Sequence, residues 1–346
     1  MMNSSHMIYV SKDTKDTTIV APFLSFGFEK EKIKEYKLDD LWDFKNELCS
    51  LSSLIAQPQY FNQVMVEFII QNHIECLYLE DRIIGIFFEK ELEKFHTMTD
   101  LSFLNHMSHL KCLKIDMHTS MFSDKPVVEI DDFTPIERLK NLECLSIPDS
   151  GHKSVYVDID FSKLIKLRNV SLQFSKRNKT IFQCPNIEEV DTRYYYDDLT
   201  EVQNWKKIKK FDAYFDKLKS FEGIEKFKYL KEFKGEFTSS LQSFEGLSSQ
   251  SIKTFYYYTE ARKTPVTLKG ISGLKNVETI KLSGLKKLNS IADLPECKNL
   301  KEFWLEESNV PDDIEEITNI KSLKKVFIDY PEKVMKKFPK LKLYMS

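Results

Sequence analysis

The stretch LKSFEGIEKFKYLKEF, residues 218–233, carries the pattern that decides the fold. An apolar residue stands at every third position, which fits neither an α-helix, with 3.6 residues per turn, nor a strand, with a period of two. The pattern returns 23 residues later, where LQSFEGL (241–247) aligns with LKSFEGI (218–224). A unit repeated at this period predicts a solenoid, in which each repeat packs on its neighbours. The six apolar residues of the first copy are Leu218, Phe221, Ile224, Phe227, Leu230 and Phe233.

A shorter motif recurs from Ile74 to the end of the chain, with apolar residues at its first, fourth and usually sixth positions. We predict that each copy is a short strand with these positions buried, and that the copies lie side by side as parallel strands about 4.8 Å apart. The period-three segments between them suit 3₁₀ turns or short irregular helices. The eleven copies begin at Ile74, Leu110, Leu142, Leu167, Ile187, Ile208, Leu230, Ile252, Val277, Leu300 and Leu323.

This L-x-x-L-x-L motif, followed by a loop and a return segment, resembles the leucine-rich repeat, and its unit length is most similar to the internalin-type repeats of bacterial proteins. The resemblance implies an α/β solenoid with a curved parallel sheet on its concave face and a 3₁₀, irregular or short helical convex side. The family usually places asparagine three residues after the last strand position. Here that position carries other residues, among them Ser175, Asp216 and Ser308. Without an asparagine ladder, we expect other groups to pair the turn amides.

Residues 1–72 lack the repeat and are predicted to form a mixed, mainly helical N-terminal cap over the end of the array. Apolar spacing predicts one helix over 39–54 and a second beginning at Pro58, and residues 19–28 suit a short strand. Residues 73–346 are predicted to be the solenoid of about eleven repeats, with a C-terminal cap from Pro331 made of a short helix and a truncated repeat.

Composition narrows the class of protein. The chain has 51 basic and 53 acidic residues and no basic tract, which argues against a nucleic-acid partner. No window approaches 18 uninterrupted apolar residues and no secretory signal is recognisable, so we expect no membrane span. Six cysteines in 346 residues are too few for a disulfide framework and favour a reducing, cytoplasmic location. Two of them, Cys184 and Cys297, stand at core positions. We expect a cytoplasmic monomer.

Three other cysteines share one motif position in the first three repeats and should line up across adjacent strands: Cys76, Cys112 and Cys144. They are either small packing residues or a thiol ladder that binds a soft metal or senses oxidation, with His106 and His109 nearby. The second reading would make the protein a metal- or thiol-dependent enzyme or redox site at the N-terminal repeats. The sequence has no phosphate-binding loop, zinc-protease motif or nucleophile elbow, which favours a protein without catalysis, cofactor or metal.

The predicted outward positions of the sheet are rich in aromatic and acidic residues. Exposed aromatic side chains are enriched in interfaces, and carboxylates complement a basic partner. Alternatively, these rings merely cover one another across strands. The leading hypothesis is a non-catalytic scaffold that captures a protein on its concave face, with a bacterial immunity or antitoxin role as its specific form. A third hypothesis is a structural component that assembles with its own copies. The predicted binding residues are Asp191, Arg193, Tyr194, Asp212, Tyr214, Phe215, Glu236, Tyr256, Tyr258, Trp304, Glu306, Phe327 and Asp329.

Overall fold

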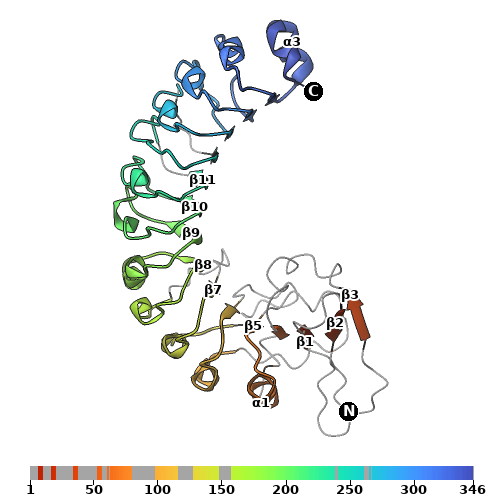
Figure 1. Ribbon diagram of the computed structural model, residues 1–346, viewed down its shortest axis with the longest axis vertical. Helices are drawn as coiled ribbons and strands as arrows, with labels where there is room; N and C mark the ends of the chain where they lie inside the picture. Colours follow the sequence, from red (N-terminus) through yellow and green to blue (C-terminus); the bar gives the residue numbers. More distant parts are fainter. Residues whose placement is uncertain are drawn as a thin grey trace. The chain divides into compact units, whose positions relative to one another are not determined.

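The structure is a computed structural model (Figure 1). Its chain separates into two compact units, residues 1–173 and 174–346. The boundary predicted between residues 72 and 73 stays a prediction. No helix among the described residues is long and apolar enough to cross a membrane. The structure describes residues 7–10, 17–20, 34–37, 53–56, 61, 63–79, 98–115, 128–147, 157–237, 241–260, 265 and 267–345.

The first unit carries the first four copies of the motif on parallel strands. Strands β5 (Cys76–Leu79), β6 (Cys112–Ile115), β7 (Cys144–Ile147) and β8 (Asn169–Gln173) pair in chain order. Helix α1 (Gln63–Gln71) precedes β5. Strand β4 (Ser53–Ala56) pairs parallel with β5 and antiparallel with β1 (Met7–Val10). Antiparallel pairing continues through β2 (Thr17–Val20) to β3 (Lys34–Lys37).

The described part of residues 1–72 consists of strands β1 to β4 and helix α1, and the prediction of a mainly helical cap stays a prediction. The helix predicted from Pro58 is present as α1, but most of the helix predicted over 39–54 lies outside the described residues, and its last two residues belong to β4. Of the strand predicted within 19–28, only residues 19–20 are described, at the end of β2. The N-terminal edge of β5 needs a backbone partner, and β4 provides it. Apolar periodicity does not report that requirement.

The second unit is a parallel sheet in which the described strands follow one another in chain order. They are β9 (Glu189–Tyr194), β10 (Lys210–Phe215), β11 (Glu232–Phe237), β12 (Thr254–Thr259), β13 (Thr279–Ser283), β14 (Glu302–Glu306) and β15 (Lys325–Ile328). Strands β5 to β15 therefore account for all eleven predicted copies. The fourth motif position is in register throughout the second unit, at Val190, Phe211, Phe233, Phe255, Ile280, Phe303 and Val326.

The chain returns between strands through short 3₁₀ helices, as the period of three predicts, because residues i and i+3 eclipse in that helix. All six apolar residues of 218–233 are at most 1% exposed. The 3₁₀ helices are η5 (Ser102–His106), η6 (Thr134–Arg138), η7 (Phe161–Lys163), η8 (Lys176–Gln183), η9 (Thr200–Val202), η10 (Ile224–Lys226), η11 (Ile271–Gly273), η12 (Leu294–Glu296), η13 (Ile314–Asn319) and η14 (Pro339–Leu343).

Side chains of neighbouring repeats pair the turn amides in place of an asparagine ladder. The backbone N–H of Leu285 donates to Ser308 Oγ (2.9 Å), and that of Gly270 donates to Asp293 Oδ2 (2.7 Å). Asp313 likewise accepts from the N–H of Ile291. Each of these bonds joins one repeat to the next, so the groups that satisfy the turns also hold successive repeats together.

The last strand is followed by helix α3 (Pro331–Lys337) and η14. The carbonyl oxygen of Tyr344 accepts from the N–H of Val326 (3.0 Å). The terminal segment therefore satisfies part of the edge of β15, where an open strand would invite pairing with another chain.

Candidate functional site

Strand alternation divides the second unit's sheet into a buried face and a face here called the open face, made of the fifth and seventh motif positions. Successive side chains of a strand point to opposite sides, and parallel pairing aligns equivalent positions into rows across the strands. The fifth-position row is Asp191, Asp212, Lys234, Tyr256, Lys281, Trp304 and Phe327. The seventh-position row is Arg193, Tyr214, Glu236, Tyr258, Ser283 and Glu306, of which Ser283 is buried.

Two of the predicted binding residues, Tyr194 and Phe215, are not on this face. Both are 0% exposed. Strands β9 and β10 extend for six residues, so the alternation brings the eighth motif position back into the core. The hydroxyl of Tyr194 donates to the carbonyl oxygen of Asp198 (2.7 Å), and Phe215 stacks on Phe237 with ring centroids 4.8 Å apart. Counting the alternation onward from the fourth position would have placed both correctly.

Small residues at the sixth position make room for these inward rings. Ala213 and Gly235 pair on adjacent strands, and the eighth-position rings Phe215 and Phe237 lie beside them. A Cβ added to Gly235 would stand 2.4 Å from Cε2 of Phe237. A small residue at the sixth position of a strand therefore leaves room for a large ring at the eighth, which the sequence motif alone does not reveal.

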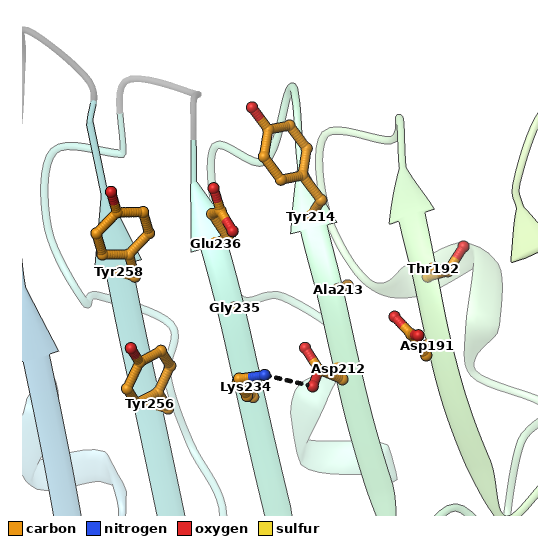
Figure 2. A pocket seen from close by; sticks show the side chains of 10 residues that line it. All are labelled: Asp191, Thr192, Asp212, Ala213, Tyr214, Lys234, Gly235, Glu236, Tyr256 and Tyr258. Carbon is orange, nitrogen blue, oxygen red and sulfur yellow. Dashed lines mark hydrogen bonds and ion pairs between the residues drawn. The ribbon is translucent and has the colours of Figure 1, made fainter. Parts of the chain in front are cut away.

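A hollow of about 410 Å³ lies on the open face over strands β9 to β12 (Figure 2). It brings together predicted residues from four repeats, and it adds Lys234, which sequence reasoning did not select. Predicted residues outside the hollow include Glu306 in the seventh-position row and Asp329, which follows β15 and accepts from the N–H of Glu307. The lining residues are Asp191, Thr192, Asp212, Ala213, Tyr214, Lys234, Gly235, Glu236, Tyr256 and Tyr258.

Cations of this chain hold two of the tyrosines. Lys234 Nζ lies 2.8 Å from Asp212 Oδ2 and 6.0 Å from the centroid of the Tyr256 ring. The hydrogen bond to Asp212 raises the pKa of Lys234. A cation beside a carboxylate and over a ring gains both an ion pair and an attraction to the ring's electrons, so the tyrosine keeps a defined orientation while half-exposed.

The seventh-position row repeats this arrangement with an arginine. Arg193 donates two hydrogen bonds to Asp216, at 2.9 Å from Nε and 3.2 Å from Nη2. Its Cζ lies 5.0 Å from the centroid of the Tyr214 ring. These tyrosines are therefore held by cations, whereas the alternative of rings covering one another describes Trp304 and Phe327, which stack at 3.7 Å.

Glu236 and Tyr258 complete the hollow on β11 and β12. Burial raises the pKa of Glu236, and the negative charges of Glu260 and Asp212 raise it further. The hydroxyl of Tyr258 donates to Glu260 Oε1 (2.6 Å), which raises the pKa of Tyr258 to about 12. At neutral pH this tyrosine is a neutral hydrogen-bond donor beside two carboxylates.

Trp304 forms an aromatic cluster at the other end of the open face. The Trp304 ring has two neighbours: Lys281, whose Nζ lies 4.2 Å from the ring centroid, and Phe327, whose ring stacks on it. The indole Nε1 is buried and has no hydrogen-bond partner among the residues that the structure describes. A buried donor left unpaired costs free energy that a partner's acceptor would recover.

The cysteine ladder is present, since Cys76 lies opposite Cys112 and Cys112 opposite Cys144, as predicted. The Cys112 Sγ lies 3.7 Å from the hydroxyl oxygen of Tyr78. Within the described ranges, no group of three or more His, Cys, Asp or Glu side chains is arranged to hold a metal ion. His109 instead packs edge-on against His73, with ring centroids 5.7 Å apart.

Cys297 should be chemically inert in the folded protein. It is 1% exposed, as expected of a core position, and burial raises the pKa of its thiol to about 12. Because the thiolate is the reactive form, iodoacetamide at about pH 8 should leave Cys297 unmodified until urea unfolds the chain. Peptide mass spectrometry measures the modification, with the half-buried Cys144 as an internal comparison. Equal labelling of Cys297 in native and unfolded protein would contradict this packing.

Comparison with known proteins identifies the fold. No family model matches the sequence, and no curated protein matches it. Among solved structures, an internalin (inlF) from Listeria monocytogenes aligns with a TM-score of 0.52 at 12% identity, covering 91% of this chain and 90% of that one. A leucine-rich repeat protein from Leptospira interrogans aligns with a TM-score of 0.45 at 16% identity, covering 83% of this chain and 81% of that one. With eleven parallel motif strands, paired in register within each unit, the chain therefore has a leucine-rich repeat fold, similar to that of an internalin.

Proposed function

We propose that this chain is a non-catalytic scaffold that captures a protein partner on the open face of strands β9 to β15. The observation that carries the proposal is the pair of in-register rows, in which half-exposed aromatic side chains lie among charged ones around a hollow of about 410 Å³. Tyrosine and tryptophan side chains of this kind anchor protein interfaces, because each buries a large area while losing little side-chain entropy.

The chemistry of the two rows supports binding over catalysis. Neither row contains histidine or cysteine, and the hydroxyls in the hollow belong to tyrosines and Thr192. The pKa of Tyr258 is raised to about 12, far from the neutral range in which a general base works best. A scaffold needs none of these groups to change protonation state.

A finer form of the proposal is that the partner is a basic protein and that the chain is a bacterial, cytoplasmic immunity or antitoxin-type protein acting as a monomer. Asp191, Asp212 and Glu236 give the hollow three carboxylates against the single ammonium of Lys234, which favours a basic partner. Sedimentation velocity separates this form from a self-assembling component, since a monomer sediments independently of concentration, whereas a self-assembling chain does not.

Alanine at the anchoring rings should abolish capture of the partner. Tyr214→Ala, Tyr256→Ala, Tyr258→Ala and Trp304→Ala should each weaken binding by about 2 kcal/mol or more, roughly 30-fold, as expected of aromatic anchors. The measurement is capture from a cell lysate with quantitative mass spectrometry, followed by titration with the purified partner. The matched control is Tyr229→Ala, which removes a ring that is 58% exposed and precedes β11 outside the two rows. Capture of every partner by all four alanine variants would refute the assignment of this face.

A further inference from the structure

On the open face, side chains form sets of three, each with a cation, a carboxylate and an aromatic ring. Lys234 pairs with Asp212 and lies over Tyr256, three residues that are adjacent in the fifth-position row. In the seventh-position row, Arg193 pairs with Asp216 and lies over Tyr214. In both sets the cation belongs to this chain, and the ring and carboxylate come from residues beside it.

A third pair, of a carboxylate and a ring, has no cation among the described residues. Glu236 and Tyr258 are directly opposite each other on β11 and β12, so a carboxylate again lies beside a tyrosine ring. Among the residues that the structure describes, no ion pair to Glu236 and no cation over Tyr258 is found, and both line the hollow. Figure 2 shows the Glu236 carboxylate between the Tyr214 and Tyr258 side chains, while Lys234 turns away toward Asp212.

The electrostatics of this position favour an added positive charge. Burial raises the pKa of Glu236 most, and the negative charges of Glu260 and Asp212 raise it further, whereas the nearby Lys234 opposes this, so the ionised form of Glu236 is incompletely compensated. Glu260 also holds the hydroxyl of Tyr258, which keeps a second carboxylate at the same edge of the hollow. A cation placed between Glu236 and Tyr258 would meet two carboxylates and a ring at once.

We propose that the hollow over β9 to β12 takes an arginine side chain of the protein partner, with its guanidinium paired to Glu236 and stacked on Tyr258. Arginine fits better than lysine because a planar guanidinium can form two parallel hydrogen bonds to a carboxylate while it lies against a ring. Arg193 already makes this combination of contacts in the same row, with Asp216 and Tyr214. The proposal rests on the protein-binding function above and specifies what the face recognises.

The test uses the full chain and three small probes: N-acetyl-arginine N-methylamide, its lysine counterpart and its citrulline counterpart, which has the shape of arginine without the charge. Binding is followed by NMR through the ring resonances of Tyr214 and Tyr258. The arginine probe should bind saturably, at least about tenfold more tightly than citrulline, because hydrogen bonds to charged groups are the stronger ones. Glu236→Gln should weaken arginine binding about tenfold and leave citrulline binding unchanged. Tyr258→Leu should weaken it about two- to fivefold.

The matched control is Glu222→Gln, which removes an exposed carboxylate just before η10, outside both rows, and should leave arginine binding unchanged. No saturable binding at about 50 mM arginine probe, equal binding of citrulline, or an unaffected Glu236→Gln variant would each overturn the proposal. Tighter binding of the lysine probe would overturn the choice of arginine.

The same variants distinguish a failure of the arginine site from a failure of the scaffold function. A captured partner that still depends on Tyr256 and Trp304 but tolerates Glu236→Gln would leave the open face as a binding surface and remove the arginine site. Loss of the partner both with the Tyr256 and Trp304 variants and with Glu236→Gln supports the scaffold function and the arginine site together. Partners indifferent to all of them would remove the scaffold function, whatever the probes show.

Discussion

Replacing Phe233 with alanine should destabilise the second unit by about 3–5 kcal/mol, the cost usual for removing a fully buried phenylalanine. Phe233 is 0% exposed. Its ring centroid lies 5.6–5.9 Å from the rings of four other phenylalanines: Phe211, Phe215, Phe221 and Phe255. These rings come from the repeat of Phe233 and from the repeats before and after it. Because they also pack on one another, they can move little into the cavity that Phe233→Ala would create.

Urea unfolding followed by far-ultraviolet circular dichroism measures this effect. Repeats of a solenoid contact mainly their neighbours, so a weakened repeat can unfold separately from the rest. Separate unfolding would appear as a smaller dependence of the unfolding free energy on urea concentration. Tyr229→Ala is the control, because its ring is largely exposed and its loss should change stability by less than about 0.5 kcal/mol. A loss below about 1 kcal/mol for Phe233→Ala would mean that the aromatic core is not packed as described.

Alanine should be much more harmful at Gly270 than at Gly246, although the two glycines hold equivalent positions in successive copies of the period-three segment. Both have left-handed backbones, with φ of +94° and +82°. At Gly246 an added Cβ would have its nearest neighbour 3.8 Å away, so the cost is the left-handed strain alone, about 1–2 kcal/mol. At Gly270 the Cβ would meet the backbone of Phe244 at 2.4 Å.

Backbone atoms cannot move aside as a flexible side chain can, so the Gly270→Ala variant must shift two repeats apart. Overpacking of this kind adds about 1–3 kcal/mol, giving about 2–5 kcal/mol in total for Gly270→Ala. The same urea experiment compares the two variants directly. Equal losses at the two positions would show that the backbones of these repeats are not in such close contact.

The repeat pattern was enough to predict which residues form the strands and the core. Leu113, Leu145 and Val170 lie opposite one another on parallel strands, and the six apolar residues of 218–233 are buried, as predicted. Such predictions succeed because burial in a solenoid depends on position within one short unit, which recurs along the chain. The aligned cysteines follow from the same argument, since equivalent positions of successive repeats become neighbours.

The candidate site could be predicted only in part. Tyr214, Tyr256 and Tyr258 were found from the strand pattern, but Tyr194 and Phe215 were placed on the wrong face. The burial of Phe215 depends on the small side chains of Ala213 and Gly235 at the preceding inward position, which is a matter of volume and not of polarity. Lys234 was missed because its role depends on a carboxylate one repeat earlier, on the neighbouring strand.

The sequence by itself therefore determined the repeat, the strand register and the buried positions, because those follow from apolar residues at a fixed spacing. Only the tertiary structure decided which charges pair, which tyrosines are held by cations and that Glu236, within the described part of the chain, has no ion pair. Ion pairs and ring contacts between strands join residues about one repeat apart, and which of several nearby groups is chosen depends on side-chain reach and direction. The strands added at the N-terminal edge belong to the same class, because the need for a backbone partner leaves no mark on the pattern of side chains.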